Sequence, residues 1–434
     1  MMRLKIKRKS QVGIGLGIVV LITRLIAAPT IVASPEAMLS YGLITGLIFS
    51  ITLFLGIFLF GYMGKKIRNQ SAGCHTIADF LQQNLQTFDY TVFISLILLL
   101  SVQGIQLQVI VIKSLLPFTI DHSFQVLFIV SYFLFIFFVT ARGGSAVNRL
   151  AQWQISFFFA VAILVPVYLL IQQGIQPVYK GILLYHPYLL VMIRDGSFFF
   201  IAIAILIGCG YIFLNPALWQ RLYQFKVVKV RRTFLLTSFL WCVIPISIVC
   251  IFFLMIHQGS FNSYSDIPLM TIQSATPVLL FLLFLGIGSS LSAALSSELQ
   301  AVLTLVKKNI FEEYQLPKRK QFHFGLIVGG SLIFITILLN FFYQPTFLEL
   351  YYLGGVIQVS LLPQIFMLIF QHDRPALFIA VCPLLGIVFG YMIYSITQPL
   401  AGIAAAFIIS SVLTLGFMLF KKIKTNPNRE FNMN

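Results

Sequence analysis

Twelve apolar runs, each long enough to cross a lipid bilayer, constrain this chain more than any other feature of its sequence. A membrane-spanning helix needs about 20 mostly apolar residues to cross about 30 Å of hydrocarbon. The apolar runs make up most of the 434 residues, and short polar segments separate them. The runs are 11–33, 37–62, 88–117, 123–141, 149–172, 195–215, 231–257, 272–306, 322–344, 347–370, 375–396 and 398–420. The sequence therefore predicts an all-α integral membrane protein with about 12 transmembrane helices.

The composition excludes a cytosolic enzyme, a disordered protein and a secreted disulfide scaffold. Only 9% of the residues are charged and 59% are hydrophobic, whereas a soluble domain has about 25% charged residues. The net charge of +17 does not indicate a nucleic-acid partner, because the basic residues lie in short runs between apolar segments. The cysteines form no CxxC pair and no Cys/His cluster, so no disulfide or metal framework is expected. These cysteines are Cys74, Cys209, Cys242, Cys250 and Cys382.

The positions of the basic residues predict the orientation of the chain. With a cytoplasmic N-terminus, all but Arg24, Lys113, Lys180 and Arg194 of the 29 Lys and Arg residues fall on the cytoplasmic side. Cytoplasmic loops of membrane proteins carry such an excess. The first run resembles a signal peptide, but it is long and a second run follows at once, so we expect an uncleaved span. The prediction is a multi-pass protein of the plasma (inner) membrane with both termini cytoplasmic.

The first and sixth runs are interrupted, and they stand at matching positions of two sets of five. Pro29 interrupts the first run, and Gly208–Tyr211 and Asn215–Pro216 interrupt the sixth. Paired broken helices indicate an inverted-repeat transporter with a binding site at the midplane; the alternative is that Pro and Gly are simply common in membrane helices. The expected division is a basic N-terminus 1–10, a first repeat 11–172, an extracellular connection 173–194, a second repeat 195–371, two additional helices 372–420 and a cytoplasmic tail 421–434.

Two ionisable residues lie inside the predicted spans. Arg24 is about 13 residues into the first run, near the midplane, where an Arg costs about 2.5–3.5 kcal/mol and needs a partner or a cavity. Glu298 is the one acid well inside a predicted span, away from its ends, and we expect it to reach the cytoplasmic interface by snorkelling. Three glutamines of the third span indicate either interhelical hydrogen bonds or a polar pathway. They are Gln103, Gln106 and Gln108.

The eighth span carries small and hydroxyl residues on one helix face. Their spacing of three, four and seven residues suits close helix packing, or else some hydroxyls face a cavity and bind a cation or a solute. The stripe consists of Gly286, Ser289, Ser290, Ser292, Ala293, Ser296 and Ser297.

An ordered set of motifs over most of residues 11–371 resembles the sodium:solute symporter family. The segment 215–226 (NPALWQRLYQFK) resembles the loop that ends the sixth core helix of that family, and 76–81 (TIADFL) resembles the motif after its second core helix. Gly143-Gly144 with Ala146-Val147 and Gln154 resembles a fifth-helix motif, and 289–311 resembles the eighth-helix motif. The resemblance implies a LeuT-like fold of two inverted five-helix repeats plus two C-terminal helices, working by alternating access.

The resemblance also implies a site. Its sodium ion would bind first-helix carbonyls and eighth-helix hydroxyls, here Ile22, Leu25, Gly286, Ser289 and Ser290; a second register puts Ala293 and Ala294 at the hydroxyl positions. The solute would contact Arg24, Ala27, Gln103, Tyr211 and Asn215, with Tyr211 where sugar-transporting relatives place a gating aromatic. Arg24 stands where the family usually has Asn, Ala151 where it has Asp, and Asn309 where it has Asp. These departures remove polar or acidic groups along the cation route.

Three hypotheses follow for the function, and none requires a cofactor beyond Na⁺ as a coupling ion. The first is a sodium-coupled importer of a small polar solute such as an amino acid or another carboxylate. The second is an ion-independent or proton-coupled carrier in which Arg24 replaces the cation. The third is a solute sensor, without transport, on a transporter scaffold. The chain has no HExxH motif and no paired membrane aspartates, so we do not expect an enzyme.

Overall fold

The computed structural model describes residues 13–71, 73–116, 122–141, 144–191, 193–259, 276–311, 346–370 and 379–425, with most of 327–342. The long elements of these residues are α-helices. They are α1 (Ile14–Leu25), α2 (Ala28–Tyr41), α3 (Leu43–Gln70), α4 (Ile77–Asn84), α5 (Thr87–Leu115), α6 (His122–Ala141), α7 (Gly144–Gln173), α8 (Ile175–Tyr185), α9 (Ser197–Leu214), α10 (Pro216–Gln224), α11 (Val227–Met255), α13 (Pro277–Val306), α15 (Phe347–Phe370), α16 (Val381–Ile396) and α17 (Pro399–Thr425). Short 3₁₀ turns η1 (Pro187–Leu190) and η2 (Ile256–Gln258) and a π-helical turn η3 (Lys307–Phe311) complete them.

The apolar helices agree with the predicted spans. Among the described residues, eight single helices are long and apolar enough to cross a membrane, and the pair α1 and α2, bent by 60°, makes a ninth. Shorter apolar helices at Leu127–Phe138, Ile327–Thr336 and Val381–Ile396 fall on the three remaining runs. The prediction of an all-α, multi-pass membrane protein is confirmed.

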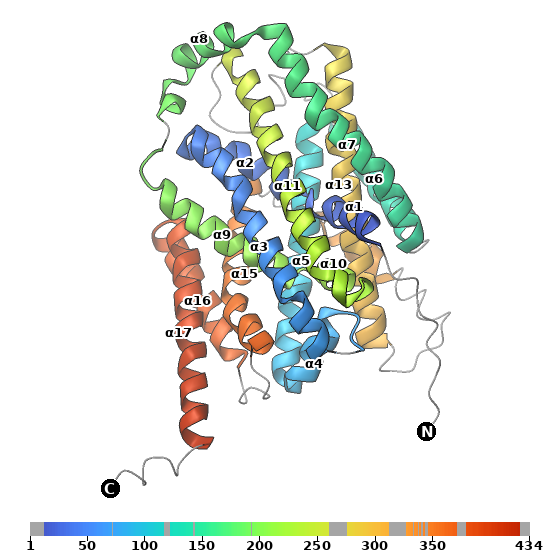
Figure 1. Ribbon diagram of the computed structural model, residues 1–434, viewed down its shortest axis with the longest axis vertical. Helices are drawn as coiled ribbons and strands as arrows, with labels where there is room; N and C mark the ends of the chain where they lie inside the picture. The colour runs from blue at the N-terminus through green and yellow to red at the C-terminus, as the bar shows by residue number, and fades with distance from the viewer. Residues whose placement is uncertain are drawn as a thin grey trace.

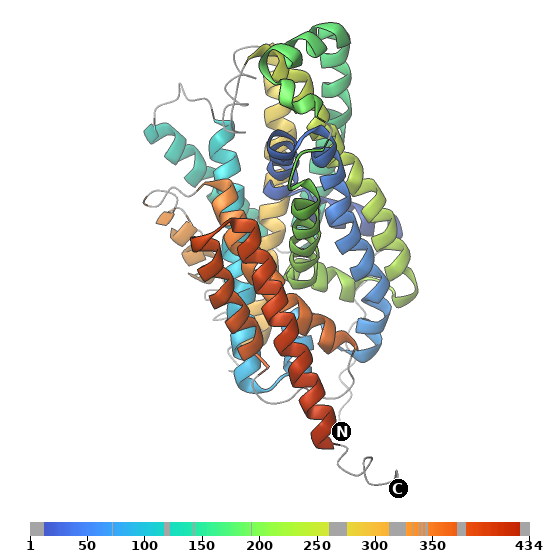
Figure 2. The ribbon, with the colours of Figure 1, turned by 90° about the vertical axis from the view of Figure 1, so that its left-hand side faces the viewer.

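The helices form one elongated bundle with distinct ends (Figure 1). The short helix α8 lies at the top of the bundle in this view, and α4 lies near the opposite end, above the lower end of α17. The two C-terminal helices α16 and α17 run along one side and pack on α15 (Figure 2). The broken spans α1–α2 and α9–α10 lie inside, against α3, α11 and α13.

Aromatic packing joins the second half of the sixth span to its neighbours. The fully buried Phe60 of α3 makes edge-on contacts with Phe213, Trp219 and Phe234, at ring-centroid distances of 5.2, 5.6 and 5.4 Å. Aromatic pairs prefer such edge-to-face arrangements. One ring of α3 thereby fixes α9, α10 and α11 around the break of the sixth span.

The first span extends further than the sequence predicted. We expected it to end at residue 33 and the next to begin at 37, but α2 continues to Tyr41 with Pro35 inside it. A proline is tolerated inside a membrane helix when neighbouring groups cover the disturbed backbone. The turn to α3 falls instead at Gly42, whose φ of 96° favours glycine. Glu36 therefore lies inside α2, away from its ends, contrary to the expectation that Glu298 is the one acid so placed.

Candidate functional site

The break of the first span leaves backbone groups that side chains of other helices satisfy. The carbonyl of Leu25, at the end of α1, accepts hydrogen bonds from the hydroxyl of Thr30 (2.8 Å) and the indole N–H of Trp241 (3.2 Å). The N–H of Ala28, at the start of α2, donates to the amide oxygen of Gln108 (3.1 Å). Irregular backbone at membrane depth requires such partners. The break predicted at Pro29 is confirmed, and Gln108 provides an interhelical hydrogen bond.

The break of the sixth span is built from Asn215, which separates α9 from α10. Its side-chain oxygen accepts from the N–H groups of Ala217 (3.0 Å) and Leu218 (3.4 Å), as an N-cap residue does. The carbonyl of Phe213 accepts from the indole N–H of Trp219 at 2.7 Å. The break is therefore at Asn215–Pro216, as predicted.

The second predicted interruption of that span, at Gly208–Tyr211, is wrong, because α9 continues through it. The glycines there permit close helix approach instead. A Cβ at Gly208 would lie 3.3 Å from the carbonyl oxygen of Thr52, and one at Gly210 would lie 2.9 Å from the Cβ of Gln358.

A buried ion pair joins the first and eighth spans. The guanidinium of Arg24 on α1 pairs with the carboxylate of Glu298 on α13, and it also donates to the carbonyl of Ala294 at 3.0 Å. Arg24 is 1% exposed and Glu298 is 7% exposed. The partner that Arg24 requires is thus Glu298, and the expected snorkelling of Glu298 is wrong, because the side chain turns into the bundle toward this cation.

A small cavity of about 40 Å³ lies where both breaks meet α5, α13 and α15. The predicted solute contacts Gln103, Tyr211 and Asn215 line it, as do Pro29 and Glu298. Of the predicted contacts, Arg24 and Ala27 are buried beside the break but are not among the described residues of its wall. The volume suffices for a few water molecules, so a solute requires the cavity to widen.

The cavity wall also contains polar atoms without partners among the described residues. The hydroxyl of Ser101 and the side-chain oxygen of Gln358 are buried and make no hydrogen bond, and Tyr351 completes the wall. Gln103 is different, because its amide donates to the carbonyl of Leu350 at 2.7 Å. Buried polar atoms without partners are uncommon in proteins, and here they face a cavity that could hold a polar solute.

The hydroxyls predicted to bind sodium donate to backbone carbonyls. Ser289 donates to the carbonyl of Gly286 at 2.8 Å and to that of Gln154 on α7 at 3.4 Å, and Ser290 donates to that of Ile287 at 2.8 Å. The carbonyl of Ile22 accepts from the N–H of Ile26 at 3.0 Å, and that of Leu25 has the partners described above. Gly286 packs on Val161, where an added Cβ would lie at 2.8 Å. Toward Arg24 of α1, the eighth helix presents the carbonyl of Ala294 and the carboxylate of Glu298.

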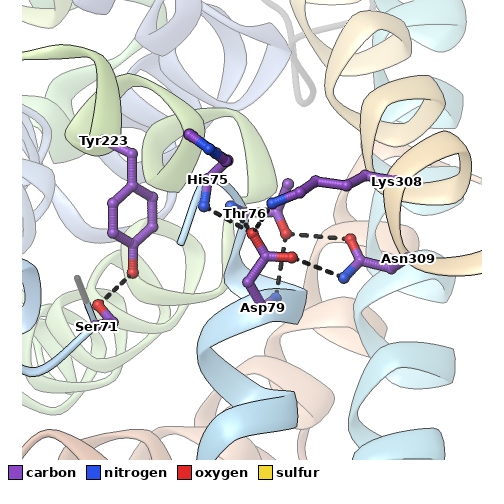
Figure 3. Close-up of polar contacts among 7 residues, drawn as sticks. All are labelled: Ser71, His75, Thr76, Asp79, Tyr223, Lys308 and Asn309. Carbon is purple, nitrogen blue, oxygen red and sulfur yellow. Dashed lines mark hydrogen bonds and ion pairs between the residues drawn. The ribbon is translucent and has the colours of Figure 1, made fainter. Parts of the chain in front are cut away.

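A polar network ties α4 to the end of the eighth span (Figure 3). Asp79 pairs with Lys308, accepts from the amide of Asn309 (2.9 Å) and closes a capping box with Thr76. The hydroxyl of Thr76 donates to the side-chain oxygen of Asn309 at 3.1 Å. Burial acts to raise the pKa of Asp79, but hydrogen bonds from Lys308, the His75 N–H and Asn309 outweigh it, so this pKa lies below its ordinary value.

The sequence contained a signal for the Arg24–Glu298 pair, which the sequence analysis did not predict. Arg24 and Glu298 are a deep base and a deep acid in a chain with few of either, and intramembrane charges usually pair. The roles of Ser101, Tyr351 and Gln358 had no such signal, since hydroxyl and amide groups are common on packed membrane helices.

Comparison with known proteins identifies the fold. No protein-family model and no curated protein matches the chain. Among solved structures, a Na⁺-coupled sialic acid symporter in its substrate-bound outward-open state superposes with a TM-score of 0.71, at 15% identity over 93% of this chain and 90% of that one. MhsT in complex with L-phenylalanine gives 0.63, at 12% identity over 95% and 99%. Mhp1, a nucleobase-cation-symport-1 family transporter in a closed conformation, gives 0.61, at 14% identity over 96% and 94%.

The chain therefore has the LeuT-like fold that the resemblance implied. The two broken spans and the cavity between them are parts of this fold in the present chain. Membership of the sodium:solute symporter family stays a prediction.

Proposed function

We propose that the protein is a secondary transporter that moves a small polar organic solute by alternating access. The observation that carries this proposal is the meeting of two broken spans at a cavity with unpartnered polar atoms, Ser101 Oγ and Gln358 Oε1. Broken helices place backbone ends and polar side chains at the midplane, where a solute can bind. The likeness to a sialic acid symporter and to Mhp1 supports the proposal.

We propose further that the Arg24–Glu298 pair takes the place of the coupling cation. The guanidinium lies between α1 and α13, the two helices from which the resemblance draws its sodium ligands. The carbonyls of Ile22 and Leu25 already accept hydrogen bonds. A tethered positive charge at this place favours an ion-independent or proton-coupled carrier over sodium coupling.

The charge balance of the site favours a zwitterionic solute such as an amino acid. Arg24 and Glu298 together carry no net charge, and the cavity is buried. A purely cationic or anionic solute would leave a net charge in this environment, which is costly. A zwitterion offers an ammonium group to Glu298 on the cavity wall and a carboxylate to Arg24 once the pair opens.

Uptake into proteoliposomes tests these proposals. Labelled amino acids would be supplied with a sodium gradient, with a proton gradient and with neither. We expect uptake that does not require sodium and that Glu298→Gln abolishes. The matched control Ser289→Ala should keep this uptake, because among the described residues the Ser289 hydroxyl bonds only to the carbonyls of Gly286 and Gln154. A strict sodium requirement that Ser289→Ala abolishes would contradict the tethered-cation proposal. Binding of a solute without any uptake would instead support the sensor.

A further inference from the structure

A second, larger groove of about 920 Å³ lies at the end of the bundle where α3 ends and α11 begins. Three basic side chains line it: Lys65 and Lys66 from α3 and Arg231 from α11. Asn69 and Asn84 contribute amides, and none of the described residues that line it is acidic. The topology of the basic loops predicts that this end faces the cytoplasm.

The positive charge of this groove is not neutralised by carboxylates of the described residues. The ion pairs among the described residues are Arg24–Glu298 and Lys308–Asp79, and none of these four residues lines the groove. Aromatic faces hold its cations instead: the Arg231 guanidinium lies 4.8 Å from the ring centroid of Tyr62, and the Lys66 ammonium lies 4.3 Å from that of Phe370. A cation over an aromatic ring keeps its full charge, so the groove favours an anion.

An exposed apolar track leads from the groove along α11 toward the middle of the membrane. Val228 at the groove is 91% exposed. Arg232 follows on the same helix face and is also exposed, and beyond it the exposed residues Leu236, Phe239 and Val243 continue that face. Phe239 follows Val228 by 11 positions, which corresponds to about 16 Å along the helix. That is about half of the hydrocarbon thickness of a bilayer, and thus about the depth that one acyl chain reaches.

From this combination we infer that the groove binds an anionic phospholipid. Its phosphate contacts Lys65, Lys66 and Arg231, the amides of Asn69 and Asn84 donate to headgroup oxygens, and an acyl chain lies on the α11 track. Basic pockets between helix ends on the cytoplasmic side suit such headgroups. A free phosphate would contact the basic side chains of the groove but not the apolar face of α11, so that face favours a lipid over a free phosphate.

Lipid binding to the detergent-purified full-length chain tests this inference. Native mass spectrometry would compare phosphatidylglycerol with phosphatidylcholine of the same acyl chains, and glycerol 1-phosphate would be added as the headgroup alone. The test variant is Lys66→Gln/Arg231→Gln. The matched control is Lys229→Gln, which removes an exposed charge of the same helix outside the groove.

We expect the double variant to bind phosphatidylglycerol about 30-fold more weakly, since each basic residue near an anionic lipid contributes about a fivefold gain. The control should bind as the parent does, and phosphatidylcholine should bind all three equally weakly. The single variant Arg231→Gln, expected to lose about fivefold, serves if the double variant fails to fold. An equal loss in Lys229→Gln would overturn the inference, as would glycerol 1-phosphate binding as tightly as the lipid.

Discussion

Removal of one member of the Arg24–Glu298 pair should destabilise the protein strongly. In Glu298→Leu the guanidinium of Arg24, 1% exposed, keeps its bond to the Ala294 carbonyl but loses its counter-charge. Breaking a buried pair in this way costs about 3–5 kcal/mol, because an uncompensated charge stays buried. The double variant Arg24→Met/Glu298→Leu removes both charges and should recover most of that loss, since apolar replacement of a buried pair is often neutral.

Equilibrium unfolding in mixed micelles measures these free energies in a double-mutant cycle. The control is Lys308→Gln, which breaks the pair with Asp79 at the bundle end, where the Lys308 side chain is 26% exposed. A pair of that exposure contributes about 0–1 kcal/mol. If the effects of Arg24→Met and Glu298→Leu add to within about 0.5 kcal/mol, the two residues are not coupled. That result, or a loss in Glu298→Leu no larger than in Lys308→Gln, would refute the reasoning.

Three further predictions concern single contacts. Asn215→Ala should lower the free energy of unfolding by about 1 kcal/mol, because α10 loses its N-cap; a loss restored by Asn215→Asp in denaturant unfolding would identify the cap as the cause. Gly61→Ala should cost about 1–3 kcal/mol, since the new Cβ would overlap the Cβ of Phe234. Gly288→Ala should not destabilise, because a Cβ there would meet open space. The stability advantage of the parent over Asp79→Asn should be complete above about pH 4 and vanish as the pH falls through the lowered pKa of Asp79; an advantage unchanged at pH 3 would contradict this.

The Asp79 network gives the third prediction a structural context. Asp79 and Thr76 begin α4, while Lys308 and Asn309 end the eighth span (Figure 3). Asn309 stands where the resemblance expects an acid, and its amide does what a carboxylate could not, because it donates to Asp79 and accepts from Thr76 together. The departure from the family motif thus has a local physical reason.

The sequence by itself determined the all-α membrane architecture, the approximate positions of the spans and the existence of both breaks. These properties are local: the length of an apolar run decides whether it crosses the bilayer, and Pro29 and Asn215–Pro216 interrupt their own helices. Local sequence patterns were less reliable where packing against adjacent helices determines whether a helix continues. Pro35 remained inside α2, and Gly208 and Gly210 remained inside α9, because adjacent helices pack closely against them.

The tertiary structure alone decided which polar groups meet. The pairing of Arg24 with Glu298 and of the Ala28 N–H with Gln108 depends on how α1, α5 and α13 are rotated and offset. A shift of one residue turns a helical side chain by about 100°, because an α-helix has 3.6 residues per turn. The two registers of the eighth helix, with either Ser289 or Ala293 at the first hydroxyl position, differ by four residues and so by about 6 Å along the helix axis. Sequence periodicity identifies a polar face, but only packing fixes its direction, and that direction brings Glu298 rather than a hydroxyl to Arg24.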